Sequence, residues 1–226
     1  MSLEEILQIS TDDIMSLAEL KEDPMFSIMS KKEILYYIRE SQRIATERAK
    51  TLKEEFIYEN LIDICNIKGI QVNICNKDCK FMDIKYRAEI YYRKSEINII
   101  RPSIELMFNE LKNNNLNIYK DKTLVIEDVI DIHLAHELYH LLEYNEQKDT
   151  SYLLNPITEL KIFNFKKVRR VLKVSEIAAH KFCKEYLDMT FHPKVLDYLY
   201  LIGRGELNEK VFLNYIYELR NELQGE

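Results

Sequence analysis

Apolar side chains recur at helical spacing over the first long stretch of the chain. Ser30 and Glu33 form a capping-box pattern, which marks a helix start. The apolar positions that follow on one helical face are Ile34, Ile38, Ala45, Ala49, Leu52 and Phe56. We therefore predict a long amphipathic helix that ends near Asn66, with Gly69 as its stop. The residues before Ser30 fit one or two short helices that end near residues 23–24.

Further helices are predicted in the second half of the chain. Residues 124–144 contain neither Gly nor Pro, and their apolar spacing indicates a second long helix. A third helix is expected over residues 175–188, with Ser175 as its N-cap. Residues 103–113 fit a shorter helix. The rest of the chain fits one or two helices that are broken at the Gly-Arg-Gly of residues 203–205.

Only a few segments alternate between apolar and polar residues as strands do. Residues 70–75 fit one strand, and residues 88–93 with residues 97–100 fit a hairpin that turns at residues 94–96. Together they predict a small sheet of about three strands. Residues 157–171 fit either a strand pair or a helix, and the pattern does not decide between them.

The composition supports a mostly helical protein. Among 226 residues there are 4 Gly and 4 Pro, too few turn formers for a barrel or sandwich of many short strands. The predicted fold class is α+β, with helices around the small sheet. We expect a helical extension over residues 1–54, the main domain over residues 55–190, and C-terminal helices over residues 191–226 that pack on it.

Charge and hydropathy limit the expected location and partners. The first ten residues carry two acids and no basic residue, unlike a secretory signal, and the longest purely apolar runs, such as residues 198–202, are too short for a membrane span. We therefore expect a soluble, cytoplasmic protein without membrane contact. The net charge of −6 gives no overall attraction to nucleic acid, and direct nucleic-acid binding is not expected.

One stretch departs from this acidic character. It contains six basic residues and no acid: Lys161, Lys166, Lys167, Arg169, Arg170 and Lys173. Such a run can be an ordinary solvated face, or it can bind an acidic substrate segment or nucleic acid.

The four cysteines are expected to be reduced thiols without a functional role. Cys75 and Cys79 are separated by three residues, and no second pair faces them, which favours buried or incidental thiols over half of a metal knuckle. Cys65 and Cys183 stand alone in the sequence.

The second long helix contains the pattern H-E-x-x-H. His136 and His140 lie one turn apart on one helical face, so both imidazoles can reach a single cation at about 2.1 Å. Glu137 is displaced around the helix and can act on a metal-bound water as general base. A chance occurrence of this pattern in a chain of this composition is roughly a one-in-a-hundred event. The sequence therefore predicts a zinc site.

A catalytic zinc site needs a third protein ligand. The residues after His140 contain no third histidine at the spacing of an all-histidine site. Glu176 is the candidate, because it opens a later helix whose small residues, Ala178 and Ala179, allow close packing on another helix. The alternative role of Glu176 is that of an ordinary N-terminal acid stabilised by the helix dipole.

Four segments of the chain resemble, in order, the pattern of the ImmA/IrrE metallopeptidases. They are LIDICNIKGIQV, AEIYYRKSEINII, LAHELYHLL and EIAAHKFCKEYL, and they span about the middle 130 residues. The resemblance implies a zincin-like fold, with His136, His140 and Glu176 as ligands of Zn²⁺ and Glu137 as base. It also implies cleavage of a regulatory protein, with a DNA-binding repressor as candidate substrate.

Other side chains near the motif in sequence are assigned supporting roles. His180 lies one turn beyond Glu176, and we expect it to contact a ligating histidine or the rim of the site. His133 shares the helical stripe of His136 and fits either a side chain packed in the core or one that supports a ligating histidine from outside. His192 is interpreted as a surface residue. Nothing in the sequence ranks the nearby tyrosines as oxyanion donors; they are Tyr139, Tyr144 and Tyr152.

Three functions fit these observations. The first is a zinc metallopeptidase that hydrolyses a peptide bond in a protein or peptide substrate. The second is a proteolytically inactive zinc-containing module that binds a regulatory partner. The third is a helical interaction protein in which the motif arose by chance.

Overall fold

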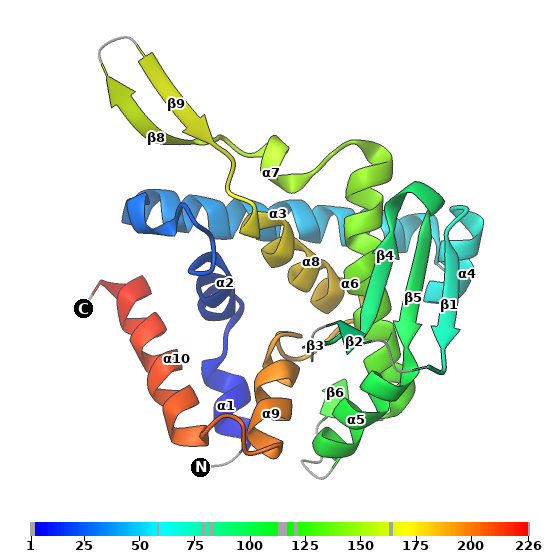
Figure 1. The fold of residues 1–226 in the computed structure, drawn as a ribbon. Helices are drawn as coiled ribbons and strands as arrows, with labels where there is room; N and C mark the ends of the chain where they lie inside the picture. The colour runs from blue at the N-terminus through cyan, green and yellow to red at the C-terminus, as the bar shows by residue number, and fades with distance from the viewer. Residues whose placement is uncertain are drawn as a thin grey trace.

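The computed structural model describes residues 3–57, 59–77, 80–81, 84–112, 117–119, 122–162 and 165–225. Helices dominate this part of the chain and surround a small three-stranded sheet, which confirms the predicted α+β class (Figure 1). The α-helices are α1 Leu3–Ile9, α2 Asp12–Leu20, α3 Lys31–Glu55, α4 Leu61–Ile67, α5 Arg101–Leu111, α6 Ile126–Glu146, α7 Thr150–Leu153, α8 Lys173–Tyr186, α9 Val195–Gly203 and α10 Glu209–Gln224.

The three-stranded sheet has the order β1-β5-β4, with β1 at Gln71–Cys75, β4 at Ala88–Tyr91 and β5 at Glu96–Ile100. β1 runs parallel to β5, and β4 pairs antiparallel with β5 as the predicted hairpin. Ser95 turns this hairpin with φ of 48°. Three separate two-stranded pairs join β2 Lys80–Phe81 to β3 Ile84–Lys85, β6 Asn117–Tyr119 to β7 Lys122–Thr123, and β8 Ile157–Ile162 to β9 Phe165–Arg169.

The predicted long helix after Ser30 is shorter than expected. Its capping box is present, but α3 ends at Glu55 and α4 is a separate helix that begins after Asn60. The Asn60 side chain accepts a hydrogen bond from the Asp63 backbone N–H at 3.0 Å, which starts a new helix. Gly69 follows α4 with φ of 71°, in the region that favours glycine. The apolar periodicity runs through both helices because both pack on the same core.

Ser175 is not the N-cap of the third predicted helix. α8 begins at Lys173, and the backbone N–H groups of Leu172 and Lys173 donate to the Asp23 carboxylate at 2.7 and 3.0 Å. The cap is therefore supplied by a residue that is distant in sequence, which no local pattern at Ser175 could indicate. Ser175 lies in the first turn of α8, and its hydroxyl faces α6, where it donates to Glu143.

The ambiguous segment of residues 157–171 forms a β-hairpin. β8 and β9 pair antiparallel with a bulge, and in Figure 1 they project from the body of the molecule. The break at residues 203–205 separates α9 from α10 as expected.

The core brings α6 and α8 together. α8 packs along α3 and α6, while α6 also contacts β4 and β5, so α6 lies between the sheet and α8 (Figure 1). Tyr139 from α6 and Phe182 from α8 are fully buried in this contact, with ring centroids 5.4 Å apart. Within the described ranges, no helix combines the length and apolar character that crossing a membrane requires.

Candidate metal centre

Helix α6 holds the two histidines of the motif side by side. The start of α6 is fixed by Asp128, which accepts from the Val125 backbone N–H at 2.9 Å and pairs with Lys122 at 2.6 Å. One turn apart on this helix, the rings of His136 and His140 have centroids 4.9 Å apart, and their Nε2 atoms are separated by 3.3 Å. Both nitrogens thus face one point in space.

Helix α8 brings Glu176 to the same point. Its Oε2 lies 3.3 Å from His136 Nε2, and its Oε1 lies 3.5 Å from His140 Nε2. Atoms that surround zinc tetrahedrally at about 2.0–2.1 Å lie about 3.3 Å from one another. The three side chains therefore match the spacing of a three-ligand metal site and could together hold a metal ion. We call these three side chains the metal group.

The charges of the group fit the same role. Burial alone would raise the pKa of Glu176, but its hydrogen bonds with His136 and His140 outweigh burial and lower that pKa. Burial alone would lower the pKa of His140, but its bonds to Glu143 and Glu176 raise it to about 10. The carboxylates thus favour the protonated, positively charged form of His140. A bound cation can take the place of that proton, because only a neutral histidine binds a metal.

Glu143 is a buried acid that the sequence analysis did not identify. Its side chain is 4% exposed, and its Oε2 lies 3.4 Å from His140 Nδ1, on the side of the ring away from Glu176. It also accepts from the Thr150 backbone N–H at 2.8 Å and from the hydroxyls of Thr150 and Ser175. A carboxylate behind a ligating histidine fixes the orientation of its ring. The i, i+3 spacing from His140 was the only local signal for this role.

The remaining histidines gather on the other side of His136. The His180 ring lies 4.7 Å from the His136 ring, and the His192 ring lies 5.3 Å from the His180 ring. His192 is 2% exposed, so its interpretation as a surface residue is wrong. Its neighbours Phe191 and Val195 pack into the core and carry it inward. His133 hydrogen-bonds the Val129 carbonyl at 2.8 Å.

These outer histidines are held in their neutral form. Burial, with the nearby His136, places the pKa of His180 well below its usual value. Burial lowers the pKa of His192 to about 3, and burial together with Arg87 lowers that of His133 to about 4. Neutral imidazoles beside the metal ligands add no positive charge that would oppose a cation.

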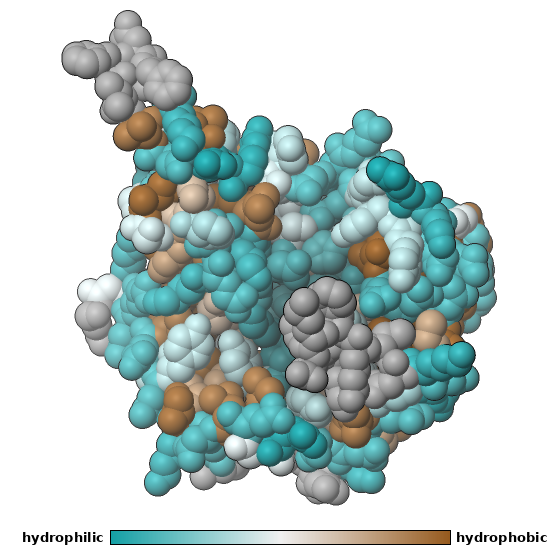
Figure 2. All heavy atoms as spheres, viewed as in Figure 1, coloured by the Kyte–Doolittle hydropathy of each residue, from teal (hydrophilic) through white to brown (hydrophobic). Residues whose placement is uncertain are grey.

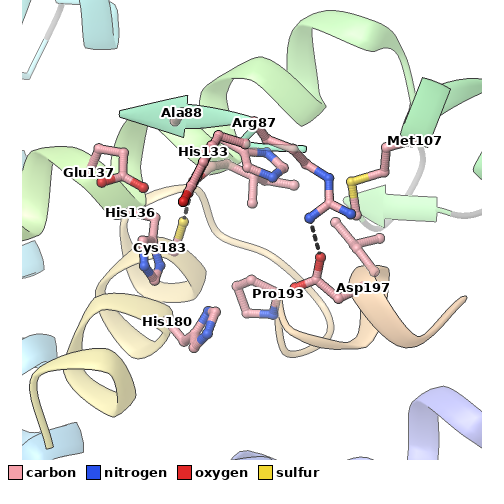
Figure 3. A pocket seen from close by; sticks show the side chains of 13 residues that line it. Arg87, Ala88, Met107, His133, His136, Glu137, His180, Cys183, Pro193 and Asp197 are labelled. Atoms are coloured by element: carbon pink, nitrogen blue, oxygen red, sulfur yellow. Dashed lines mark hydrogen bonds and ion pairs between the residues drawn. The ribbon is translucent and has the colours of Figure 1, made fainter. Parts of the chain in front are cut away.

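A cavity of about 240 Å³ opens directly beside the metal group (Figure 3). His136, Glu137 and His180 line it together with Ala88 of the edge strand β4. Apolar side chains make up part of the wall, and the Arg87–Asp197 ion pair, at 2.6 Å, closes another part. Glu137 therefore has access to space next to the metal group, as its proposed role as a base requires.

A second cavity, of about 680 Å³, lies on the His140 side. Tyr144 and Tyr152 line it, together with Tyr92. Tyr139 is different, because it is fully buried and its hydroxyl bonds Thr150 Oγ1 at 2.7 Å. Tyr139 thus supports the Glu143 network instead of facing a substrate.

The cysteines take no part in this group. Cys65 and Cys183 are buried free thiols, and burial raises the pKa of Cys65 to about 12. Cys183 donates to the Ile132 carbonyl at 2.9 Å. Cys75 is also a free thiol, and Cys79 lies outside the described residues.

Searches of protein-family models, curated proteins and solved structures find no match to this chain. The resemblance to the ImmA/IrrE metallopeptidases stays a prediction from the sequence motifs.

Proposed function

We propose that this protein is a zinc-dependent peptidase. The observation that carries the proposal is the arrangement of His136, His140 and Glu176 at tetrahedral ligand spacing, with Glu137 beside them on a cavity wall. Two imidazoles and one carboxylate are a ligand set of catalytic zinc sites. A purely structural zinc site uses four protein ligands, and the described residues offer three.

Residues of this chain would hold the zinc ion, transfer the proton and orient the ligands. A zinc ion held by the three ligands would make water more acidic and would polarise a peptide carbonyl. Glu137 accepts a proton from the attacking water and passes it to the leaving amine. Glu143 and Ser175 keep the His140 ring oriented through Nδ1.

An extended polypeptide fits the surroundings of the group. β4 is one of the two edge strands of the three-stranded sheet, and Ala88 at its start lines the cavity that contains Glu137. An exposed strand edge can pair with an added peptide strand through main-chain hydrogen bonds. The resemblance stated above favours a regulatory protein, with a DNA-binding repressor as the first candidate to assay.

The decisive experiment compares Glu137→Gln with the parent protein. Glutamine keeps the size of the side chain but cannot accept the proton, so cleavage of a candidate repressor should fall by about 10² to 10⁴-fold. Zinc content, measured by elemental analysis, should stay unchanged. A glutamine variant that cuts as fast as the parent refutes the peptidase mechanism.

Two further outcomes test the rest of the assignment. Glu176→Ala should weaken zinc binding, as His136→Ala should, and equal zinc affinity in the parent and Glu176→Ala refutes the third ligand. If neither the parent nor Glu137→Gln cuts any candidate, yet both relieve repression in cells, the protein is the non-proteolytic zinc module.

A further inference from the structure

The β8–β9 hairpin stands apart from the core. In the described part of the chain its two strands pair with each other and with no other strand, and they project outward beyond α7 (Figure 1). We call β8, β9 and the adjoining Arg170 the basic arm. Leu160 and Val168 of the arm are each 45% exposed, and Figure 2 shows hydrophobic and hydrophilic residues side by side on it.

The basic arm carries a concentrated positive charge. Residues 157–170 contain five basic residues and one acid, Glu159, so their net charge is +4, while the whole chain carries −6. The rest of the chain therefore carries −10. Glu159, the one acid of the arm, is shared between Lys167 at 2.7 Å and Arg169 at 3.0 Å.

The pairing of the strands places two of the basic residues at opposed backbone positions. Lys161 and Lys166 are cross-strand partners in the register of β8 and β9. Like charges at opposed positions destabilise a strand pair, and an isolated two-stranded hairpin is only marginally stable in water. An anionic ligand that lies along the arm would remove this repulsion and cover the exposed apolar residues.

The end of the basic arm nearest the core, at Arg170, lies beside the cavity that His140 borders. The Arg170 guanidinium donates to the carbonyls of Leu154 at 2.9 Å and Ser151 at 3.3 Å. It also lies 4.9 Å from the centre of the Tyr152 ring, and Tyr152 lines the cavity that His140 borders. A chain bound along the arm can therefore continue into the cavity beside the metal group.

We propose that the basic arm binds an acidic segment of a polypeptide and that, on the proposed peptidase function, this segment belongs to the substrate. A short acidic segment matches the few surplus charges of the arm. Double-stranded DNA carries a negative charge about every 1.7 Å along its axis, so it would extend past the arm and meet the repulsion of an acidic body. The charge distribution therefore favours an acidic polypeptide over nucleic acid.

The test uses a fluorescently labelled peptide of alternating Glu and Gly, with its Gln-Gly counterpart as the uncharged control. Binding is measured by fluorescence anisotropy with the full-length protein at low and high salt. The parent should bind the Glu peptide in a salt-dependent way, because exposed charges are screened. Lys161→Glu with Lys166→Glu should weaken this binding by about tenfold or more.

A matched variant separates a local effect from a change in total charge. Lys50→Glu with Lys210→Glu changes the net charge by the same amount at exposed positions on the C-terminal half of α3 and on α10, which lie apart from the arm in Figure 1. This variant should bind the Glu peptide within about twofold of the parent, because distant surface charges are screened. Equal losses in both variants, no loss in the arm variant, no binding by the parent, or tighter binding of a DNA duplex than of the Glu peptide would each overturn the proposal.

The peptide measurement needs neither zinc nor Glu137. Repeating it with zinc-free protein and with Glu137→Gln keeps the two proposals distinguishable. If the arm binds the Glu peptide but no candidate repressor is cut, only the peptidase proposal is refuted. If the arm variant cuts the candidate repressor and binds the Glu peptide as the parent does, only the role of the arm is refuted.

Discussion

Replacing Glu143 with glutamine tests whether the carboxylate behind His140 controls the metal site. In the parent this buried side chain accepts hydrogen bonds from the Thr150 N–H, the Thr150 hydroxyl and the Ser175 hydroxyl, and it faces His140 Nδ1. Glutamine keeps one acceptor oxygen but presents an amide donor on its other branch. The variant therefore loses the negative charge and at least one of these contacts without a change in volume.

Two magnitudes follow for Glu143→Gln. Loss of such a partner typically weakens metal affinity about 10 to 100-fold, which corresponds to about 1.4–2.7 kcal/mol. In the metal-free protein, a buried network that loses one hydrogen bond should lower the free energy of unfolding by about 1–3 kcal/mol. Zinc affinity is measured by competition with a chelating dye, and stability by urea denaturation in the presence of a chelator.

The pH dependence of the stability loss has a defined sign. Burial alone would raise the pKa of Glu143, but its bonds with His140, Ser175 and Thr150 outweigh burial and lower it below the ordinary 4.5. The folded state therefore favours the ionised carboxylate, and this contribution is present above pH 4.5 and is lost as the pH falls through the lowered pKa. The difference in stability between the parent and Glu143→Gln should shrink in acid.

Glu146→Gln is the matched control for this prediction. Glu146 lies on the same helix, but its side chain is 41% exposed and pairs with Arg48 at 3.2 Å. The same chemical change there should leave zinc affinity within about twofold and stability within about 0.5 kcal/mol of the parent. The reasoning is refuted if Glu143→Gln binds zinc as tightly as the parent, or if both variants lose the same affinity.

Two other side chains give independent predictions. His180→Ala removes the ring that packs 4.7 Å from His136, so zinc affinity measured by calorimetry should fall about 10 to 100-fold, and unchanged affinity and activity would contradict its supporting role. Burial, with the nearby Asp128, raises the pKa of Asp131 to about 6 from 3.8, so the folded state holds this proton more tightly than the unfolded state does. The resulting stability is present below pH 3.8 and is lost as the pH rises through about 6. Asp131→Asn should therefore raise the free energy of unfolding by about 1–3 kcal/mol at neutral pH and by little near pH 4, and an equal gain at both pH values would refute this explanation.

The parts of the site that the sequence predicts follow from the geometry of one helix or from the ligand needs of a metal. The spacing of His136 and His140 fixes their relation through helix geometry alone, so the motif was sufficient. Glu176 followed from the chemical need for a third ligand. Glu143 was not identified, because its role depends on Thr150 beyond the end of α6 and on Ser175 of another helix. A buried acid and an exposed acid look the same in a sequence.

Helix boundaries show the same division between local and distant causes. The capping box at Ser30 is local, and the structure contains both of its hydrogen bonds. The start of α8 is set by Asp23, whose carboxylate is brought there by the folding of the N-terminal helices. His192 was misinterpreted for a related reason, because its burial depends on how the segment after α8 folds back onto that helix.

The position of Glu176 therefore depends on residues at the far end of the chain. Glu176 lies in the first turn of α8, three residues after Lys173, whose backbone N–H Asp23 caps together with that of Leu172. Lys173 in the same turn pairs with Glu19 at 2.8 Å, and Lys181 and Lys184 further along α8 bind Asp12. α3 packs along the same helix. Because a metal site tolerates only small errors in ligand position, these contacts make the N-terminal helices part of what holds the third ligand in place.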